Sequence, residues 1–129
     1  MIVVDTSALM AILLREAAAD ACEAALAEAD AIAMAAPTFV EAMVVATGRG
    51  IGPRMASLVE VLGVRIWSCD EAAARRAAEA HARWGRGRHP AKLNFGDTFS
   101  YELARRLDCP LLFVGDDFAQ TDVRSALAA

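Results

Sequence analysis

The sequence predicts an α/β fold in which a parallel sheet is covered by helices on both faces. Short apolar runs alternate along the chain with longer segments of helical pattern, and strands joined by helical crossovers pair in parallel. Hydrophobic residues make up 57% of the chain and charged residues 23%, which excludes general disorder. A length of 129 residues fits one core of ordinary size, so we expect a single domain over residues 1–129.

Four short apolar segments are predicted to be strands. The first ends at Asp5, and the last is followed by Gly115. Aspartate and glycine are typical of the turns that end strands. The third alternates in polarity and contains β-branched side chains, whereas the second is rich in alanine. The four segments are residues 2–4, 31–35, 64–67 and 111–114.

Six segments between or after these strands are predicted to be helices. Thr6 and Ser7 offer capping hydroxyls to the first, Pro37 suits the first turn of the third, and Ser68 or Asp70 can cap the fifth. The six are residues 8–14, 16–29, 38–47, 53–62, 70–84 and 94–107. The Gly-Arg-Gly-Arg-His-Pro run at residues 85–90 is predicted to be a loop.

Composition also bounds the cellular setting. The longest apolar run near the start, residues 8–14, is far shorter than the roughly 20 residues of a membrane-spanning helix. No basic segment precedes it, so a signal peptide is not expected either. We therefore expect a cytoplasmic protein. Cys22, Cys69 and Cys109 are widely spaced and form no zinc motif, so they are expected to be reduced thiols.

Acidic residues at the strand ends are the main functional signal. Asp5 follows the first strand, and Asp116 and Asp117 follow the last, where sites form in open parallel sheets. Glu41 and Asp97 lie in helices among apolar neighbours, where a lone acid is costly to bury. Singly, each acid has a simpler reading as a helix cap, a helix-dipole charge, a turn residue or a solvated side chain. Together they suit a hard divalent cation, Mg²⁺ or Mn²⁺.

Positive charge is concentrated just before Asp97, although the net charge of the chain is −4. Arg86, Arg88 and Lys92 lie in the flexible loop, and guanidinium groups match the geometry of phosphate. The wider set also includes Arg75, Arg76, Arg83, Arg105 and Arg106. A solvated helix face beside a mobile loop is the alternative reading. Next to an acidic metal site, however, this charge indicates phosphodiester chemistry.

These motifs, taken in order, resemble the PIN-domain family, and within it the VapC-type toxin ribonucleases. Asp5 in Val-Val-Asp-Thr-Ser-Ala resembles the first metal-binding acid, with Thr6 or Ser7 as its supporting hydroxyl. Glu41 resembles the second acid, and Asp97 in Leu-Asn-Phe-Gly-Asp-Thr-Phe resembles the third. In the last segment, Leu-Leu-Phe-Val-Gly-Asp-Asp-Phe, Asp116 is placed ahead of Asp117 as the fourth acid because it is closer to the strand.

The resemblance implies a PIN-like three-layer sandwich with a central parallel sheet of four to five strands. It also implies a homodimeric, metal-dependent endoribonuclease toxin that acts on structured RNA and is neutralised by a VapB-type antitoxin. Asp5 and Asp97 would hold Mg²⁺ or Mn²⁺, while Glu41 and Asp116 shape the site or help hold a second ion. His89 is expected to contact phosphate or to lie on the surface rather than to catalyse.

Three other functions fit the sequence less well. An aspartyl phosphatase needs a second acid two residues after the first, where this chain has Ser7. A phosphorelay receiver needs a lysine near its acid, and the only lysine, Lys92, lies in the basic loop. A PIN-like module that binds RNA or protein without cleaving is disfavoured by the intact acids, and a cleavage assay separates it from a nuclease.

Overall fold

In the computed structural model, residues 1–127 are described, and they form a four-stranded parallel sheet with helices on both faces. The strands are β1 (Ile2–Val4), β2 (Ile32–Ala35), β3 (Arg65–Trp67) and β4 (Leu111–Leu112), in the order β3-β2-β1-β4. Each neighbouring pair is parallel, with Val3 opposite both Ala33 and Leu111. The predicted α/β class and its four-stranded sheet are therefore confirmed.

The helices lie where the sequence placed them, with differences of a few residues at their ends. They are α1 (Thr6–Leu13), α2 (Ala19–Glu28), α3 (Ala36–Gly48), α4 (Gly52–Val61), α5 (Glu71–Trp84) and α6 (Asp97–Leu107). Pro37 lies in the first turn of α3, and Asp70 caps α5 by accepting a hydrogen bond from the Ala73 N–H at 2.9 Å. No helix in the described part of the chain is long and apolar enough to cross a membrane.

Two boundary predictions are wrong for local reasons. The cap of α1 is Asp5, not Thr6 or Ser7, because Asp5 is the extended residue before the helix and its carboxylate accepts from the Ser7 N–H. Strand β4 ends at Leu112 rather than at residue 114, since the Val114 N–H donates to the Ser7 hydroxyl instead of to a neighbouring strand.

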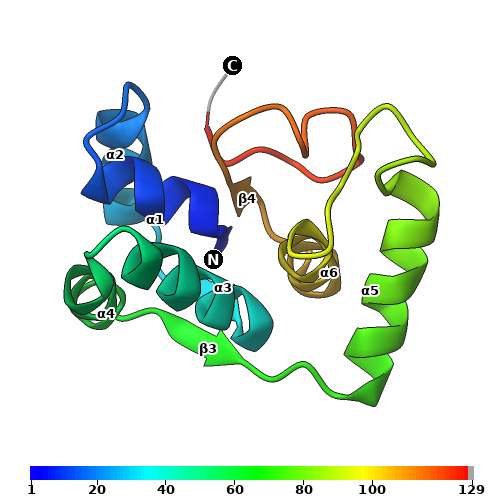
Figure 1. The fold of residues 1–129 in the computed structure, drawn as a ribbon, viewed down its shortest axis with the longest axis horizontal. Helices are drawn as coiled ribbons and strands as arrows, with labels where there is room; N and C mark the ends of the chain where they lie inside the picture. Colours follow the sequence, from blue (N-terminus) through cyan, green and yellow to red (C-terminus); the bar gives the residue numbers. More distant parts are fainter. Residues whose placement is uncertain (128–129) are drawn as a thin grey trace.

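Alternation along β1 divides the core into two layers. Ile2 and Val4 pack with α1, α2, α3 and α4, while Val3 packs with α5 and α6 on the other face. Figure 1 shows this division, with α6 between α5 and the helices of the other layer. Since Asp5 follows the same alternation as Val3, its side chain belongs to the α6 side of the sheet. The central position of β1 brings the residues after it close to those after β4 and to α6.

Candidate active site

Asp5 is the centre of the polar cluster at the end of β1. Its side chain is only 4% exposed, and Oδ2 accepts hydrogen bonds from the Ser7 N–H at 3.1 Å and from the Ser7 hydroxyl at 2.8 Å. The same Ser7 oxygen accepts from the Val114 N–H at 3.0 Å, which ties the end of β1 to the segment after β4. Ser7 therefore fixes both the orientation of Asp5 and the position of the chain that leads to Asp116 and Asp117.

Ser100, which the sequence analysis did not single out, holds the other oxygen of Asp5. Its fully buried hydroxyl donates to Asp5 Oδ1 at 2.6 Å and lies 3.2 Å from the Thr38 hydroxyl. Ser100 stands three residues after Asp97 on α6, so the two share a helix face. A polar residue at that spacing from a candidate acid is the signal that could have identified it.

Glu41 enters the cluster from the first half of α3. Its Oε1 accepts a hydrogen bond from the Thr6 hydroxyl at 2.7 Å. Burial raises the pKa of Glu41, and the charge of Asp5 raises it further, while the bond from Thr6 acts in the opposite direction. Thr6 therefore supports Glu41, and Ser7 supports Asp5, so the two predicted supporting hydroxyls serve different acids.

Gly96 makes room for the Glu41 carboxylate. A Cβ atom at position 96 would overlap Glu41 Oε2 and lie 2.9 Å from its Cδ. The Glu41 carboxylate thus lies directly against the backbone that precedes Asp97. A side chain at position 96 could be accommodated only if Glu41 moved away.

Asp97 is the first residue of α6 and is 7% exposed. Its Oδ2 accepts from the Asn94 N–H at 3.0 Å, and its own N–H donates to Asn94 Oδ1 at 2.9 Å, a reciprocal pair of the capping-box kind. Burial raises the pKa of Asp97 to about 7, against the bond from Asn94 and with further contributions from Asp5, Asp117 and Glu41. Four acids from separate parts of the chain therefore act on one another here.

The two acids after β4 differ in their relation to this cluster. Both are exposed, and Gly115, with φ at 105°, turns the chain just before them. Asp117 is one of the acids that raise the pKa of Asp97. Asp116 is not among those acids in the described part of the chain. The charge of Asp117 therefore influences Asp97, although the sequence analysis placed Asp116 ahead of Asp117 as the fourth acid.

The basic loop between α5 and α6 lies on the surface. Arg86, Arg88 and Lys92 are exposed, and no ion pair joins them to an acid within residues 1–127. The loop closes through the bond from the Arg86 N–H to the Leu93 carbonyl at 2.9 Å. His89 belongs to the loop's own structure, because its Nδ1 accepts from the Ala91 N–H at 3.0 Å and its ring packs edge-on against Trp84.

The oxygen donors of the cluster suit a hard divalent ion, although the described side chains are not close enough together to form a complete coordination sphere. No group of three or more metal-binding side chains at ligand spacing occurs within residues 1–127. Carboxylate and hydroxyl oxygens make up the cluster, which is the chemistry that Mg²⁺ and Mn²⁺ prefer. Burial raises the pKa of Asp97 and Glu41 most, and neighbouring acids raise both further, so a bound cation would favour the charged form of each.

Comparisons with known proteins identify the family of the chain. The PIN domain family model matches residues 2–124. Ribonuclease VapC42 of Mycobacterium tuberculosis is 43% identical over 129 residues, covering 96% of this chain and 98% of its own. Ribonuclease VapC of Mycolicibacterium smegmatis is 40% identical over 124 residues, covering 94% of this chain and 96% of its own.

Two solved structures share the fold at low sequence identity. Mycobacterium tuberculosis VapC20, described as a sarcin-ricin loop cleaving toxin, superposes with a TM-score of 0.78 at 18% identity and covers 99% of this chain and 100% of its own. A toxin–antitoxin complex from Klebsiella pneumoniae gives a TM-score of 0.71 at 19% identity and covers both chains completely. The family match and the close relatives over nearly the whole length show that the chain belongs to the VapC ribonucleases of the PIN domain family.

Proposed function

We propose that this chain is the toxin of a toxin–antitoxin pair and hydrolyses phosphodiester bonds of structured RNA with Mg²⁺ or Mn²⁺. The observation that carries the proposal is the group of acids around Asp97. Burial raises the pKa of Asp97 most, and Asp5, Asp117 and Glu41 raise it further. No ion pair neutralises Asp5, Glu41 or Asp97 within residues 1–127. Relatives more than 40% identical are named ribonucleases.

Asp5 and Asp97 are the acids we assign to the divalent ion. Ser7 and Ser100 orient Asp5, and Asn94 orients Asp97, so both carboxylates are held by hydrogen bonds from neighbouring groups. When bound, the ion supplies positive charge for the phosphate oxygens and makes water a stronger nucleophile. Asp97 must give up its proton to act as a ligand, because its pKa of about 7 leaves much of it neutral near pH 7.

Glu41 and one acid after β4 complete the proposed site. Glu41 is positioned by Thr6 and by the space above Gly96. For the fourth position we favour Asp117 over Asp116, since the charge of Asp117 reaches Asp97. These two acids either shape the pocket around the scissile phosphate or share a second ion.

We assign the exposed loop cations Arg86, Arg88 and Lys92 to the RNA backbone. The loop that carries them leads into α6, so phosphate held by the loop would lie on the side of the chain from which Asp97 is reached. Guanidinium groups bind phosphate through paired hydrogen bonds, and such contacts set orientation rather than base sequence.

An antitoxin and a second copy of the chain are the protein partners we propose. The Klebsiella structure is a toxin–antitoxin complex of the same fold, and a VapB-type antitoxin is the corresponding partner here. An apolar groove beside Glu41 presents Val40, Val44 and Phe95, which are 58%, 66% and 77% exposed. Exposed apolar residues of this kind favour burial in a homodimer. A cytoplasmic location follows from the proposed RNA substrate.

The experiment that tests the activity is cleavage of a stem-loop RNA by purified protein. Cleavage should require Mg²⁺ or Mn²⁺ and should stop when EDTA is added in excess. Asp97→Asn should abolish most of it, whereas Asp108→Asn, an exposed acid at the end of α6, should not. Cleavage that continues unchanged in EDTA, or that is as fast in Asp97→Asn, would overturn the proposal.

A further inference from the structure

A groove between α5 and α6 collects four arginines outside the acidic cluster. Arg76 and Arg83 come from α5, and Arg105 and Arg106 come from the last turn of α6. Figure 1 shows that α5 lies beside α6 on the opposite side from α3 and α4, so this groove is separate from the surface around Glu41. The charges in the groove are not used by the proposed catalytic site.

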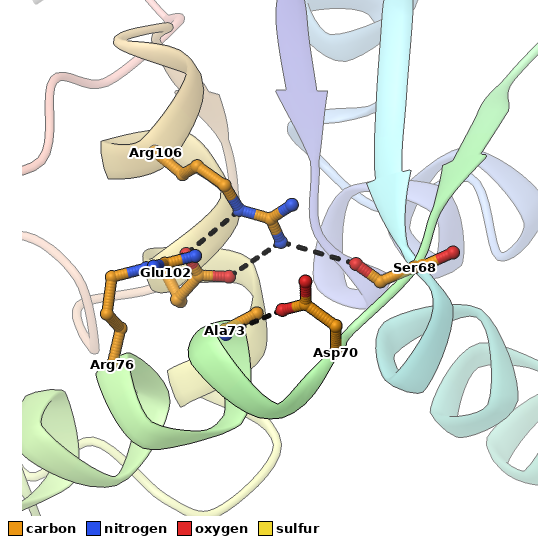
Figure 2. Close-up of polar contacts among 6 residues, drawn as sticks. All are labelled: Ser68, Asp70, Ala73, Arg76, Glu102 and Arg106. Carbon is orange, nitrogen blue, oxygen red and sulfur yellow. Dashed lines mark hydrogen bonds and ion pairs between the residues drawn. The ribbon is translucent and has the colours of Figure 1, made fainter.

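Two of the four arginines pair with the buried Glu102, and Arg76 does so across the two helices. Arg76 Nε donates to Glu102 Oε2 at 3.0 Å, and Arg106 donates to both oxygens of Glu102 at 3.0 and 2.8 Å (Figure 2). The Glu102 side chain is only 4% exposed, so its charge is matched by these two partners. Arg106 also reaches the Ser68 carbonyl at 3.4 Å. Arg76 and Arg106 are therefore structural.

The other two arginines, Arg83 and Arg105, both face Asp122 without a hydrogen bond to it. Arg83 and Arg105 each approach Asp122 Oδ2 only to 3.9 Å, which is beyond hydrogen-bonding distance. Their side chains are 65% and 53% exposed. Glu79 and Glu102 also line the groove, so its four arginines face three carboxylates, which leaves an excess of one positive charge. Arg83 and Arg105 can therefore offer donors to a further anion.

The floor of the groove is already ordered. Asp122 Oδ1 accepts from the Tyr101 hydroxyl at 2.5 Å, and that hydroxyl accepts from Trp84 Nε1–H at 3.0 Å. Arg83 lies over the Trp84 ring, 4.4 Å from its centroid. Trp84 and Tyr101 are 8% and 7% exposed, so their rings offer no free face on which a base could stack. The accessible donors are guanidinium groups, which suit a phosphate.

We propose that Arg83 and Arg105 bind a phosphate of the RNA backbone away from the cleaved bond. This inference rests on the proposed ribonuclease function and extends its substrate contacts. Arg105 follows Asp97 by eight residues on α6, which is about 12 Å along the helix axis. A few nucleotides of an RNA strand are enough to span that length. An RNA held at the acids can therefore reach the groove with its neighbouring backbone.

The first test measures binding of a fluorescein-labelled stem-loop RNA in EDTA, where it is not cut. The double variant Arg83→Gln, Arg105→Gln should bind several-fold more weakly. The slope of log affinity against log salt should fall in magnitude by about 0.7 to 0.9 for one lost phosphate contact. The matched control is Arg75→Gln, Arg124→Gln, which removes the same charge from two exposed arginines outside the groove. Its affinity should fall less, and its slope should stay nearer the parent's.

A second variant tests the groove in the opposite direction. Asp122→Asn keeps an oxygen for the Tyr101 hydroxyl but removes the negative charge that Arg83 and Arg105 share. RNA binding should become several-fold tighter. The control Asp108→Asn removes an equal charge at a left-handed position that asparagine tolerates, and it should have a smaller effect.

The outcomes separate this inference from the function on which it rests. If the parent binds and cuts RNA but the double variant keeps both affinity and salt slope, the groove is not an RNA contact and the inference is wrong. Weaker binding of an acidic protein partner with unchanged RNA binding would contradict it as well. A parent that neither binds nor cuts the RNA would contradict the proposed function and this inference together.

Discussion

The Ser100 hydroxyl donates a 2.6 Å hydrogen bond to Asp5 Oδ1 across 95 positions of sequence. This bond joins the end of β1 to the first turn of α6, which begins with Asp97. The Ser100 hydroxyl therefore helps to fix the position of Asp5 relative to Asp97, the two acids assigned to the metal ion. Ser7 performs the matching task between Asp5 and the segment after β4.

Replacing Ser100 with alanine should weaken Mn²⁺ binding by roughly 10- to 100-fold, the usual cost of losing a residue that orients a metal ligand. Calorimetric titration of Mn²⁺ measures this directly. Thr98→Ala is the matched control, since Thr98 is equally buried on α6 but donates to the Phe95 carbonyl. Equal Mn²⁺ affinities for the two variants would show that the bond to Asp5 has no positioning role.

Gly96→Ala should slow RNA cleavage because the new Cβ displaces the Glu41 carboxylate. The backbone at Gly96 has helical dihedral angles, which alanine adopts without strain, so the melting temperature should change little. Gly48→Ala is the control, because a Cβ at position 48 meets no atom within 4 Å. Cleavage by Gly96→Ala at the parent rate would contradict the contact between Gly96 and Glu41.

The choice of the fourth acid can be tested by comparing two neighbours. Asp117→Asn should reduce Mn²⁺-dependent cleavage by at least about tenfold, because its charge acts on Asp97. Asp116→Asn should stay within a few-fold of the parent. The two variants have the same composition and differ by one position, so initial cleavage rates compare them fairly. The reverse order of effects would restore Asp116 as the fourth acid.

The stability of the metal-free protein should depend on the protonation of Asp97. Its pKa is about 7 in the folded chain and about 3.8 when unfolded, so between these values the folded state binds more protons. The free energy of unfolding should therefore fall as the pH rises from about 4 to 7, by up to about 1.4 kcal/mol per pH unit from this group. Urea unfolding in EDTA should show a flatter pH dependence for Asp97→Asn. A parent and variant with parallel pH profiles would contradict the raised pKa.

Much of the fold could be predicted because local patterns and tertiary packing agree. The buried strand Ile2–Val4 and the helix capped by Asp70 are examples, and both appear where the sequence placed them. Helix α6 begins at Asp97 rather than at residue 94, where the Asp97 N–H donates to the Asn94 side chain, and periodicity alone does not reveal such a bond. Strand β4 is shorter for a similar reason, since Ser7 takes the Val114 N–H.

The sequence pointed to the candidate acids and to the supporting hydroxyls of Thr6 and Ser7, but not to Ser100 or Gly96. Asp5, Glu41 and Asp97 stand out as charges among apolar residues, whereas Ser100 and Gly96 look ordinary until α6 is placed against β1 and α3. The groove between α5 and α6 could not be predicted from the sequence either. Arg83 and Arg105 lie far apart in sequence, and only the packing of α5 on α6 brings both to Asp122.

The central claim is that Asp5 and Asp97 hold the divalent ion, and titration of Mn²⁺ into the metal-free protein tests it most directly. The parent should bind Mn²⁺ and release protons from Asp97 as it does so, a release that rises as the buffer pH falls below about 7. Asp5→Asn and Asp97→Asn should each lose most of that binding, while the exposed control Asp70→Asn keeps it. Binding by Asp97→Asn with the parent's affinity, or no binding by the parent, would contradict the account.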